Sequence, residues 1–581
     1  MIFGLSTFGE HALGELDAAY DESVSSPISF LLSDPDADLI FVLVAAPPDF
    51  TVGPAYGLPY VFGDQPLGGL TDEDAAGPSP IYLSDVGFTT DPDDTPASTI
   101  MPAVLAEPFS FQTAIALDGS GTVDASFGAI RILNGDADAN GDSMPAGEMD
   151  YLLGKAWAGW TVEIYVGGTF NVGRADERRL SFTEFGLFFR GQVGRPSAAR
   201  GEIVLPILDH MARLDTLLNA GTYAGTGGLE GDAEVAGVNK PKAFGQVRNI
   251  SGVLIDAVSL VWQFHDGVVQ AFDEVRDNGV ALPVDADYPD YAALIAAIIP
   301  LGFCATCKAL GLMRHSAAPA GAITADVKGD ATGGYVSTPG AIVRRMATTA
   351  GASPLADPAE IDAVAFADLE IAAPYVSGFY SGTVPVTVAD ACRTVIRDVG
   401  FVTFDRIGRL TVGILDAPSD APVAAHGESD IAESPVEMET LEPVYRWTLG
   451  YRRNHTVQEA DSLGAISASA RRDYSQPERL TASAEASGVR TIFPLAEDRR
   501  DSTLLDEEAD AAAERDRRLR RDKVARQLHT VDLVAAPFQA KLGETRRLIH
   551  ARHGLSLGRD GVVVGIAESA RKRVSTVTLM V

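Results

Sequence analysis

The 581-residue chain is 46% hydrophobic, so it can bury several cores, and its length predicts about three to five domains. Its formal net charge is −34 at pH 7, and 20 Asp and Glu residues precede Arg131, the first cation. Because DNA affinity depends on Lys and Arg displacing condensed counterions, sequence-specific nucleic-acid binding is not expected. No apolar run approaches the roughly 20 residues that span a bilayer, so membrane insertion is not expected either.

The cation-free N-terminal quarter has two interpretations. Like-charge repulsion keeps a protein soluble and monodisperse, and this alone accounts for the acidity. Alternatively, an acidic surface beside a DNA path would let DNA slide past without sticking. The sequence does not separate the two.

Short alternating segments punctuated by Gly, Pro, Asn and Asp predict a mainly β chain with some α-helix. The first 80 residues contain apolar segments at 28–32 and 39–46 and are expected to fold, whereas the proline-rich stretches at 47–80 and 418–422 are expected to be linkers or long loops. Strands are predicted at 161–166, 401–415, 444–451 and 574–581, and helices at 288–299, 387–399 and 503–527.

Six segments, in order along the chain, carry a resemblance to a known family. They are YLSDVGFTTDPDDTPASTIMP at 82–102, FGAIRILNGDADANGD followed by YLLGKAWAGWTVEIYVGG within 127–168, the stretch 229–282 that begins LEGDAEVAGVNKPKAFGQVRN, CATCKALGLMRHSAAPAGAITADVKGD at 304–330, FVTFDRIGRLTVGIL at 401–415, and YRWTLGYRRNHTVQ at 445–458. Together they resemble the tail hub, or baseplate hub, family of phage tail proteins from siphophages, whose tails are long and non-contractile. The first 80 residues carry none of this resemblance.

The resemblance implies a multidomain fold, mainly β with some α, in which two tube-like β-barrel domains are accompanied by decorating α+β domains. It implies a homotrimer, since three subunits with two such barrels each would match a sixfold tube ring. The implied division is 1–81 for an N-terminal peripheral β domain, 82–217 for the first barrel, 218–345 for an inserted decorating domain, 346–435 for a small α+β decorating domain, and 436–581 for the second barrel.

The function implied by the resemblance is structural. A tail hub lies in the virion at the distal end of the tail, is assembled in the host cytoplasm, and adapts the sixfold tube to a threefold tip. Its implied partners are the distal tail protein or tail tube ring, the tape-measure protein, and tip or fibre proteins. It would gate exit of the tape measure and DNA during genome ejection. The alternative is a receptor- or glycan-binding tail-tip protein that acts in host attachment.

No catalytic residues are predicted. The sequence contains no H-E-x-x-H, no G-x-S-x-G and no P-loop lysine pattern, and most of its acids lie in polar, turn-like contexts rather than in apolar pockets. We therefore expect no enzyme and no cofactor other than calcium at the loop described next.

One loop resembles the start of a calcium site. Asp136, Asp138, Asn140 and Asp142 place oxygen ligands at alternate positions around a glycine, as Ca²⁺ coordination requires. The bidentate acid expected at the twelfth position is replaced by Gly147, so the register of an EF-hand fails. A polar turn closed by Asp and Asn side chains explains the same residues without metal.

Two further patterns have more than one interpretation. Cys304 and Cys307 form a C-x-x-C pair, but the chain offers too few further ligands for zinc or an iron–sulfur cluster, so packed apolar thiols are favoured. The arginine-rich end of the helix predicted at 503–527 indicates a solvated surface helix, a docking surface for an acidic neighbour or, least of all, nucleic-acid binding. The tryptophans are interpreted as core residues: Trp157, Trp160, Trp262 and Trp447.

Overall fold

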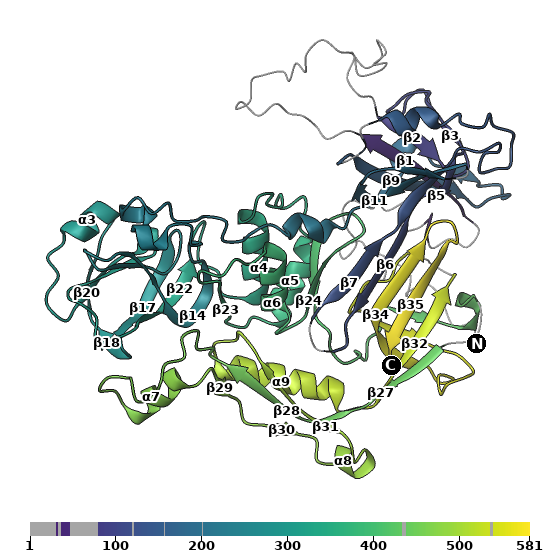
Figure 1. Ribbon diagram of the computed structural model, residues 1–581. Coiled ribbons are helices and arrows are strands. Elements are labelled where there is room, and N and C mark those ends of the chain that lie inside the picture. The colour runs from purple at the N-terminus through teal and green to yellow at the C-terminus, as the bar shows by residue number, and fades with distance from the viewer. Residues whose placement is uncertain are drawn as a thin grey trace, which may run out of the picture.

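The chain is mainly β and multidomain in the computed structural model (Figure 1). The structure describes residues 31–32, 37–46, 80–118, 121–155, 157, 159–199, 201–432, 437–534 and 538–581. Within these ranges no helix is long and apolar enough to cross a membrane. The prediction of a mainly β, multidomain fold with some α is confirmed, and the two tube-like domains are half-barrels with open edges.

The first half-barrel consists of two facing sheets. Leu39 to Leu43 of its strand β1 are all buried, because the strand lies between β9 and β2 and packs on the second sheet. The first sheet comprises β1 (Asp38–Ala46), β2 (Ile81–Ser84), β9 (Thr161–Phe170), β10 (Arg178–Arg179) and β11 (Gly186–Gln192). The second comprises β5 (Leu105–Glu107), β8 (Ala129–Leu133), β12 (Ser197–Ala199) and β13 (Glu202–Pro206), and a small hairpin joins β3 (Phe88–Thr89) to β4 (Ile100–Met101).

The structure differs from the domain boundary predicted at residue 81. All nine residues of β1 pair with β9, from Asp38 opposite Thr169 to Ala46 opposite Thr161. Residues 38–46 therefore belong to the first half-barrel, since its central strand would otherwise be missing. Apart from residues 31–32, 37, 80 and 81, the remainder of the predicted peripheral domain lies outside the described residues, including most of the apolar segment predicted at 28–32.

The second half-barrel is built mostly from the C-terminal part of the chain. Val577, Leu579 and Val581 lie together in its core, as the alternation predicted. Its strands are β26 (Ala424–His426), β27 (Glu437–Leu441), β32 (Arg526–Leu533), β33 (Thr545–Leu548), β34 (Arg559–Ser569) and β35 (Val574–Met580).

A hairpin from the first part of the chain completes this second half-barrel. Strand β6 (Ser110–Ile115) pairs with β7 (Val123–Phe127) and also with β34, where residues 110–114 lie opposite residues 569–565. In Figure 1 the hairpin reaches down from the first half-barrel and lies alongside the yellow strands. The two half-barrels are thus joined by main-chain hydrogen bonds, and the division predicted between 82–217 and 436–581 differs from the sheets at this point.

The middle of the chain forms two sheets that pack on each other. Strand β23 (Gly378–Tyr380) comes from the range predicted as a separate small domain, yet it pairs with β14 of the inserted domain. The first sheet contains β14 (Ala243–Ser251), β17 (Val269–Asp277), β18 (Val280–Leu282), β22 (Ile323–Asp330) and β23. The second contains β15 (Val253–Asp256), β16 (Val261–Gln263), β19 (Val284–Asp287), β20 (Cys304–Cys307) and β21 (Leu312–His315), with α3 (Tyr291–Ala296) beside it.

Three helices and a hairpin connect this middle part to the half-barrels. Helix α6 (Val388–Ile396) confirms the helix predicted at 387–399, and the Thr387 side chain caps it by accepting the N–H of Asp390. The strand predicted at 401–415 is a hairpin, because the Asp405 carboxylate accepts two backbone N–H groups and turns the chain between β24 (Phe401–Phe404) and β25 (Leu410–Gly413). The other helices are α4 (Pro339–Thr349) and α5 (Ala363–Ala372).

A separate unit lies between β27 and β32, within the range predicted as the second barrel. It runs beneath the rest of the molecule in Figure 1 and centres on β28 (Val444–Tyr451), which matches the predicted strand and packs against α9 (Glu508–Asp522). We call it the lower unit. Its other elements are α7 (Ala468–Ser475), β29 (Arg479–Leu480), β30 (Ala484–Glu485), α8 (Val489–Ile492) and β31 (Glu497–Ser502).

Four phenylalanine rings lie where the two half-barrels meet. Phe538, from the C-terminal part, has its ring centroid 5.2 Å from that of Phe188 and 5.8 Å from that of Phe109, and Phe41 completes the cluster. All four are buried. Arg406 lies 4.1 Å above the Phe188 ring and donates to the carbonyl of Phe538 at 2.7 Å, so it ties the cluster to the β24–β25 hairpin.

Replacing Phe538 by Ala should lower the free energy of unfolding by ~3–5 kcal/mol, because it removes a buried ring and leaves a cavity. The measurement is urea denaturation followed by tryptophan fluorescence. Leu557→Ala is the matched control, since Leu557 lies in the same half-barrel but is 97% exposed, and it should change stability by less than ~0.5 kcal/mol. Equal losses in the two variants would show that the cluster does not stabilise the junction.

Candidate functional site

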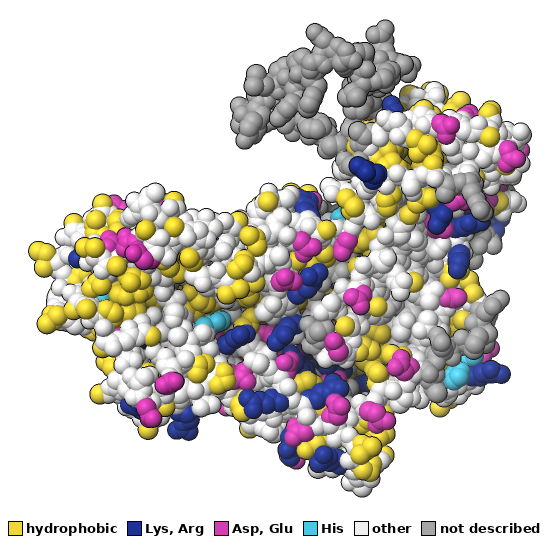
Figure 2. Space-filling model, in the orientation of Figure 1, with side chains coloured by type: hydrophobic (Ala, Val, Ile, Leu, Met, Phe, Trp, Pro, Cys, Tyr) yellow, Lys and Arg dark blue, Asp and Glu magenta, His cyan; other side chains and the backbone are white. Residues whose placement is uncertain are grey.

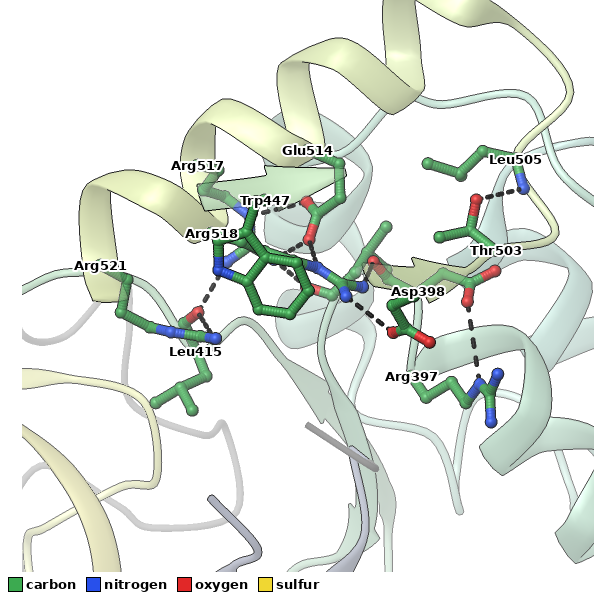
Figure 3. Close-up of polar contacts among 12 residues, drawn as sticks. Arg397, Asp398, Leu415, Trp447, Thr503, Leu505, Glu514, Arg517, Arg518 and Arg521 are labelled. Carbon is green, nitrogen blue, oxygen red and sulfur yellow. Dashed lines mark hydrogen bonds and ion pairs between the residues drawn. The ribbon is translucent and has the colours of Figure 1, made fainter. Parts of the chain in front are cut away.

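Three arginines of α9, Arg517, Arg518 and Arg521, point inward and donate to backbone carbonyls of neighbouring elements (Figure 3). Arg517 donates to the carbonyl of Leu415 at 2.6 Å and to that of Val399 at 2.8 Å. Arg518 donates to the carbonyl of Asp398 at 2.8 Å, and Arg521 also reaches Leu415 at 3.1 Å. These carbonyls follow α6 and β25, so the helix fastens the lower unit to the middle part of the chain.

A buried carboxylate holds two of these guanidinium groups in place. Glu514 is fully buried and accepts from Arg517 at 2.6 and 2.8 Å and from Arg518 at 2.8 Å. Arg518 also pairs with Asp501 of β31 at 2.9 Å and lies 5.4 Å from the Trp447 ring. Burial alone would lower the pKa of Arg518, but the carboxylates of Glu514 and Asp501 outweigh it and raise that pKa.

A second buried acid lies on the other side of Arg518. The Asp398 side chain is 1% exposed and accepts the backbone N–H of Leu504 at 2.6 Å. Burial raises its pKa to about 7, and the Leu504 N–H and the nearby Arg518 and Arg397 oppose that rise only in part. The proton of this carboxyl is therefore lost near neutral pH, at the contact between α6 and the lower unit.

Glu514 and the three inward arginines line a cavity of about 190 Å³ where the lower unit, the β24–β25 hairpin and the second half-barrel meet. Its wall contains six arginines and four acids, together with apolar side chains such as Leu415, Val444 and Met580. The arginines are Arg397, Arg499, Arg517, Arg518, Arg521 and Arg526, and the acids are Glu442, Glu497, Glu514 and Asp522. The arrangement can hold elements together and attract anions.

The predicted arginine-rich helix thus exists, but several of its arginines face inward, while Arg520 is 59% exposed. Neither a solvated surface nor an open docking surface describes Arg517, whose side chain is 11% exposed, or Arg518, at 6%. The spacing of Glu514 three and four residues before these arginines was the available signal, since such pairs meet on one helix face. Local spacing does not reveal which face is buried.

The four residues of the predicted calcium loop lie in one turn. The Asp138 carboxylate accepts the backbone N–H groups of Asn140 and Asp142, both at 2.9 Å, which is the bonding of an Asx turn. The Asn140 amide donates to the carbonyl of Val86 at 3.1 Å. Across the described ranges, no group of three or more His, Cys, Asp and Glu residues is placed to hold a metal ion, and calcium at Asp136, Asp138, Asn140 and Asp142 stays a prediction.

The three cysteines are free thiols packed in cores. Cys304 and Cys307 are three residues apart in strand β20, so their side chains point to opposite faces, and they contact different hydrophobic clusters. Burial raises the pKa of Cys304 to about 11 and that of Cys392 to about 12, which keeps the thiols protonated and unreactive. The four tryptophans are buried as predicted.

Comparisons with known proteins give structural likenesses only. No protein-family model matches the sequence, and no curated protein matches it. Among solved structures, the chain is similar to a chain of the virion of a native gene transfer agent particle, with 14% identity and a TM-score of 0.34 over 59% of this chain and 84% of that one.

Two bacterial proteins show likenesses of similar size. A tail protein from Neisseria meningitidis MC58 is 11% identical, with a TM-score of 0.30 over 82% of this chain and 92% of that one. The 43 kDa tail protein of prophage MuSo2 from Shewanella oneidensis is 9% identical, with a TM-score of 0.32 over 83% and 96%. TM-scores of this size do not establish a common function.

Replacing Glu514 by Ala should lower the free energy of unfolding by ~3–5 kcal/mol, because two largely buried guanidinium groups lose their shared carboxylate. Urea denaturation measures the change. Asp516→Ala is the control on the same helix, since Asp516 is 60% exposed in its pair with Arg515 and should contribute less than ~1 kcal/mol. A loss no greater than that of the control would contradict the role of Glu514.

The raised pKa of Asp398 predicts a pH-dependent difference from the variant Asp398→Asn. The fold favours the neutral carboxyl, so the wild-type chain should lose stability relative to the Asn variant as pH rises from about 4, the ordinary pKa, to about 7. The relative loss should reach at most ~4 kcal/mol and then level off. Denaturation midpoints of both proteins from pH 4 to 8 test this. A constant difference would mean that Asp398 does not titrate in this range.

Proposed function

We propose that the chain is a structural subunit of a phage tail, and that it serves as the tail hub at the distal end of the tail. The observation that carries the proposal is the pairing of β6 with β34, which makes the two half-barrels one continuous unit. A single subunit then presents two tube-like sheets at a fixed spacing. Three subunits would present six, which matches the threefold-to-sixfold adaptation that the sequence resemblance implies.

An open strand edge supports assembly by strand addition. Strand β27 ends the strand order of the second half-barrel, and within the described residues nothing pairs with its outer edge. Gln527 of β32 exchanges backbone hydrogen bonds with Val581, on the side of β32 away from β27. Because backbone groups alternate in direction along a strand, the N–H and C=O of the next residue, Leu528, point toward β27, where Leu528 lies opposite Glu439. The backbone of Thr440 therefore points away from β32, toward a neighbouring chain in the assembly we propose.

In this role the protein acts mechanically and is not an enzyme. Its partners would be the distal tail protein or tail tube ring, the tape-measure protein, and tip or fibre proteins, and it would gate the exit of the tape measure and DNA. The alternative of a glycan-binding tip protein receives less support. In the described part of the chain the four tryptophans are buried and Tyr151 is the one aromatic among the exposed large hydrophobic residues, whereas stacking on sugars needs exposed rings.

Light scattering of the purified chain tests the proposal directly. A mass near three chains is the expected result, and it should be unchanged by a calcium chelator because the Asp138 carboxylate is already engaged by backbone N–H groups. A stable monomer at all concentrations would contradict a self-assembling hub.

Proline substitution in β27 tests the edge itself. Thr440→Pro removes an outward-pointing N–H and should lower the mass to that of a monomer with little change in melting temperature. Glu439→Pro removes an N–H that points into the sheet, so it should lower the melting temperature instead. Thr440→Ala should preserve the trimer. If Thr440→Pro remains trimeric, strand β27 is not the contact.

A further inference from the structure

The wall of the arginine-lined cavity has a net charge opposite in sign to that of the whole chain. The whole chain carries a net charge of −34, yet the wall of this cavity has six arginines against four acids, an excess of two positive charges. A positive, partly apolar wall strengthens the attraction for an anion, because low-dielectric surroundings screen charges less than water does.

Several guanidinium groups of the wall retain donors that the protein does not use. Arg526 makes one long hydrogen bond, from Nε to the carbonyl of Arg521 at 3.4 Å, and in the described part of the chain its terminal nitrogens have no acceptor. Arg499 pairs with Glu497 through Nε at 2.8 Å. Among the residues that the structure describes, Arg397 makes only a 3.4 Å bond to the Ser502 carbonyl and a 3.9 Å ion pair with Asp398. Guanidinium groups with free N–H pairs are the usual ligands of phosphate.

Arg526 also lacks full electrostatic compensation. Burial, followed by the neighbouring Arg559, lowers its pKa, and Asp522 opposes this only in part. Asp522 is itself engaged by Arg521 at 2.6 Å and by the Trp447 indole at 3.0 Å. An anion beside Arg526 would supply the missing negative charge.

We propose that this cavity binds a small multivalent oxyanion of the phosphate class, held chiefly by Arg526, with Arg499 and Arg397 contributing from the same wall. Its volume of about 190 Å³ far exceeds the ~10–15 Å³ that one water requires by the same measure. Because the wall joins α9 and β31 to β32 and β35, a bound anion would stiffen the contact between the lower unit and the second half-barrel. This proposal does not depend on a tail role.

Binding is tested on the full chain with potassium phosphate, against potassium chloride at the same ionic strength to correct for screening. Isothermal titration should detect phosphate, and the melting temperature should rise with phosphate more than with chloride. A single-stranded oligonucleotide offers the same phosphate chemistry on a polymer. It should not bind, because the chain's net charge of −34 repels a long polyanion.

Variants assign the site. Arg526→Gln should weaken phosphate binding by about tenfold or more, as the loss of a charge-assisted contact implies. Arg520→Gln is the matched control, since Arg520 is 59% exposed, pairs with Asp416 at 2.8 Å and does not line the cavity. If Arg526→Gln fails to fold, Arg499→Gln, at a residue 38% exposed, gives the same readout. Three results would each overturn the proposal. The first is an equal affinity for phosphate in the cavity variants and the control variant, and the second is a rise in melting temperature no greater with phosphate than with chloride. The third is an oligonucleotide that binds the wild-type chain but not Arg526→Gln.

Discussion

The pairing of β6 with β34 is the constraint on which the rest of the structure depends. It joins residues 110–114 to residues 565–569, and Ser569 donates to Glu107, which lies 462 residues earlier in the chain. The chain between β6 and β34 therefore starts and ends beside the same sheet, so the middle sheets, the helices and the lower unit are inserted between two neighbouring strands of that sheet. The buried Phe41, Phe109, Phe188 and Phe538 rings pack where the two half-barrels meet.

Cations are in the minority, and a few of them connect segments in the interior. The chain has 46 Lys and Arg against 80 Asp and Glu. Lys and Arg side chains also lie on the surface (Figure 2), and Arg520 is 59% exposed. Arg517 and Arg518 each bond both a buried carboxylate and a backbone carbonyl, and Arg406 bonds Phe538 from above an aromatic ring. A guanidinium group has five donors in a fixed fork, so one side chain can connect several segments at once. Burial raises the pKa of Asp398 to about 7, so this acid carries less negative charge near neutral pH than a surface carboxylate does.

What the sequence predicted well depends on short-range patterns. Alternation placed β28 and the buried Val577, Leu579 and Val581, and a helical period placed α6. What it missed depends on partners far along the chain: β1 belongs to the first half-barrel because it pairs with β9, and β6 belongs to the second because it pairs with β34. The sequence shows how many arginines α9 has, but only the packing of β28 and the β24–β25 hairpin against the helix decides that Arg517 and Arg518 face inward while Arg520 stays exposed.

The same long-range pairing sets an order of events during synthesis. A ribosome makes β6 and β7 early and β34 near the end, so the β6 edge lacks its partner while most of the polypeptide is still being translated. The second half-barrel is complete only after β34 and β35 have left the exit tunnel. A nascent chain without β34 and β35 therefore lacks the finished sheet that bears the β27 edge, and the strand-edge contact proposed for β27 cannot form before translation has passed β35.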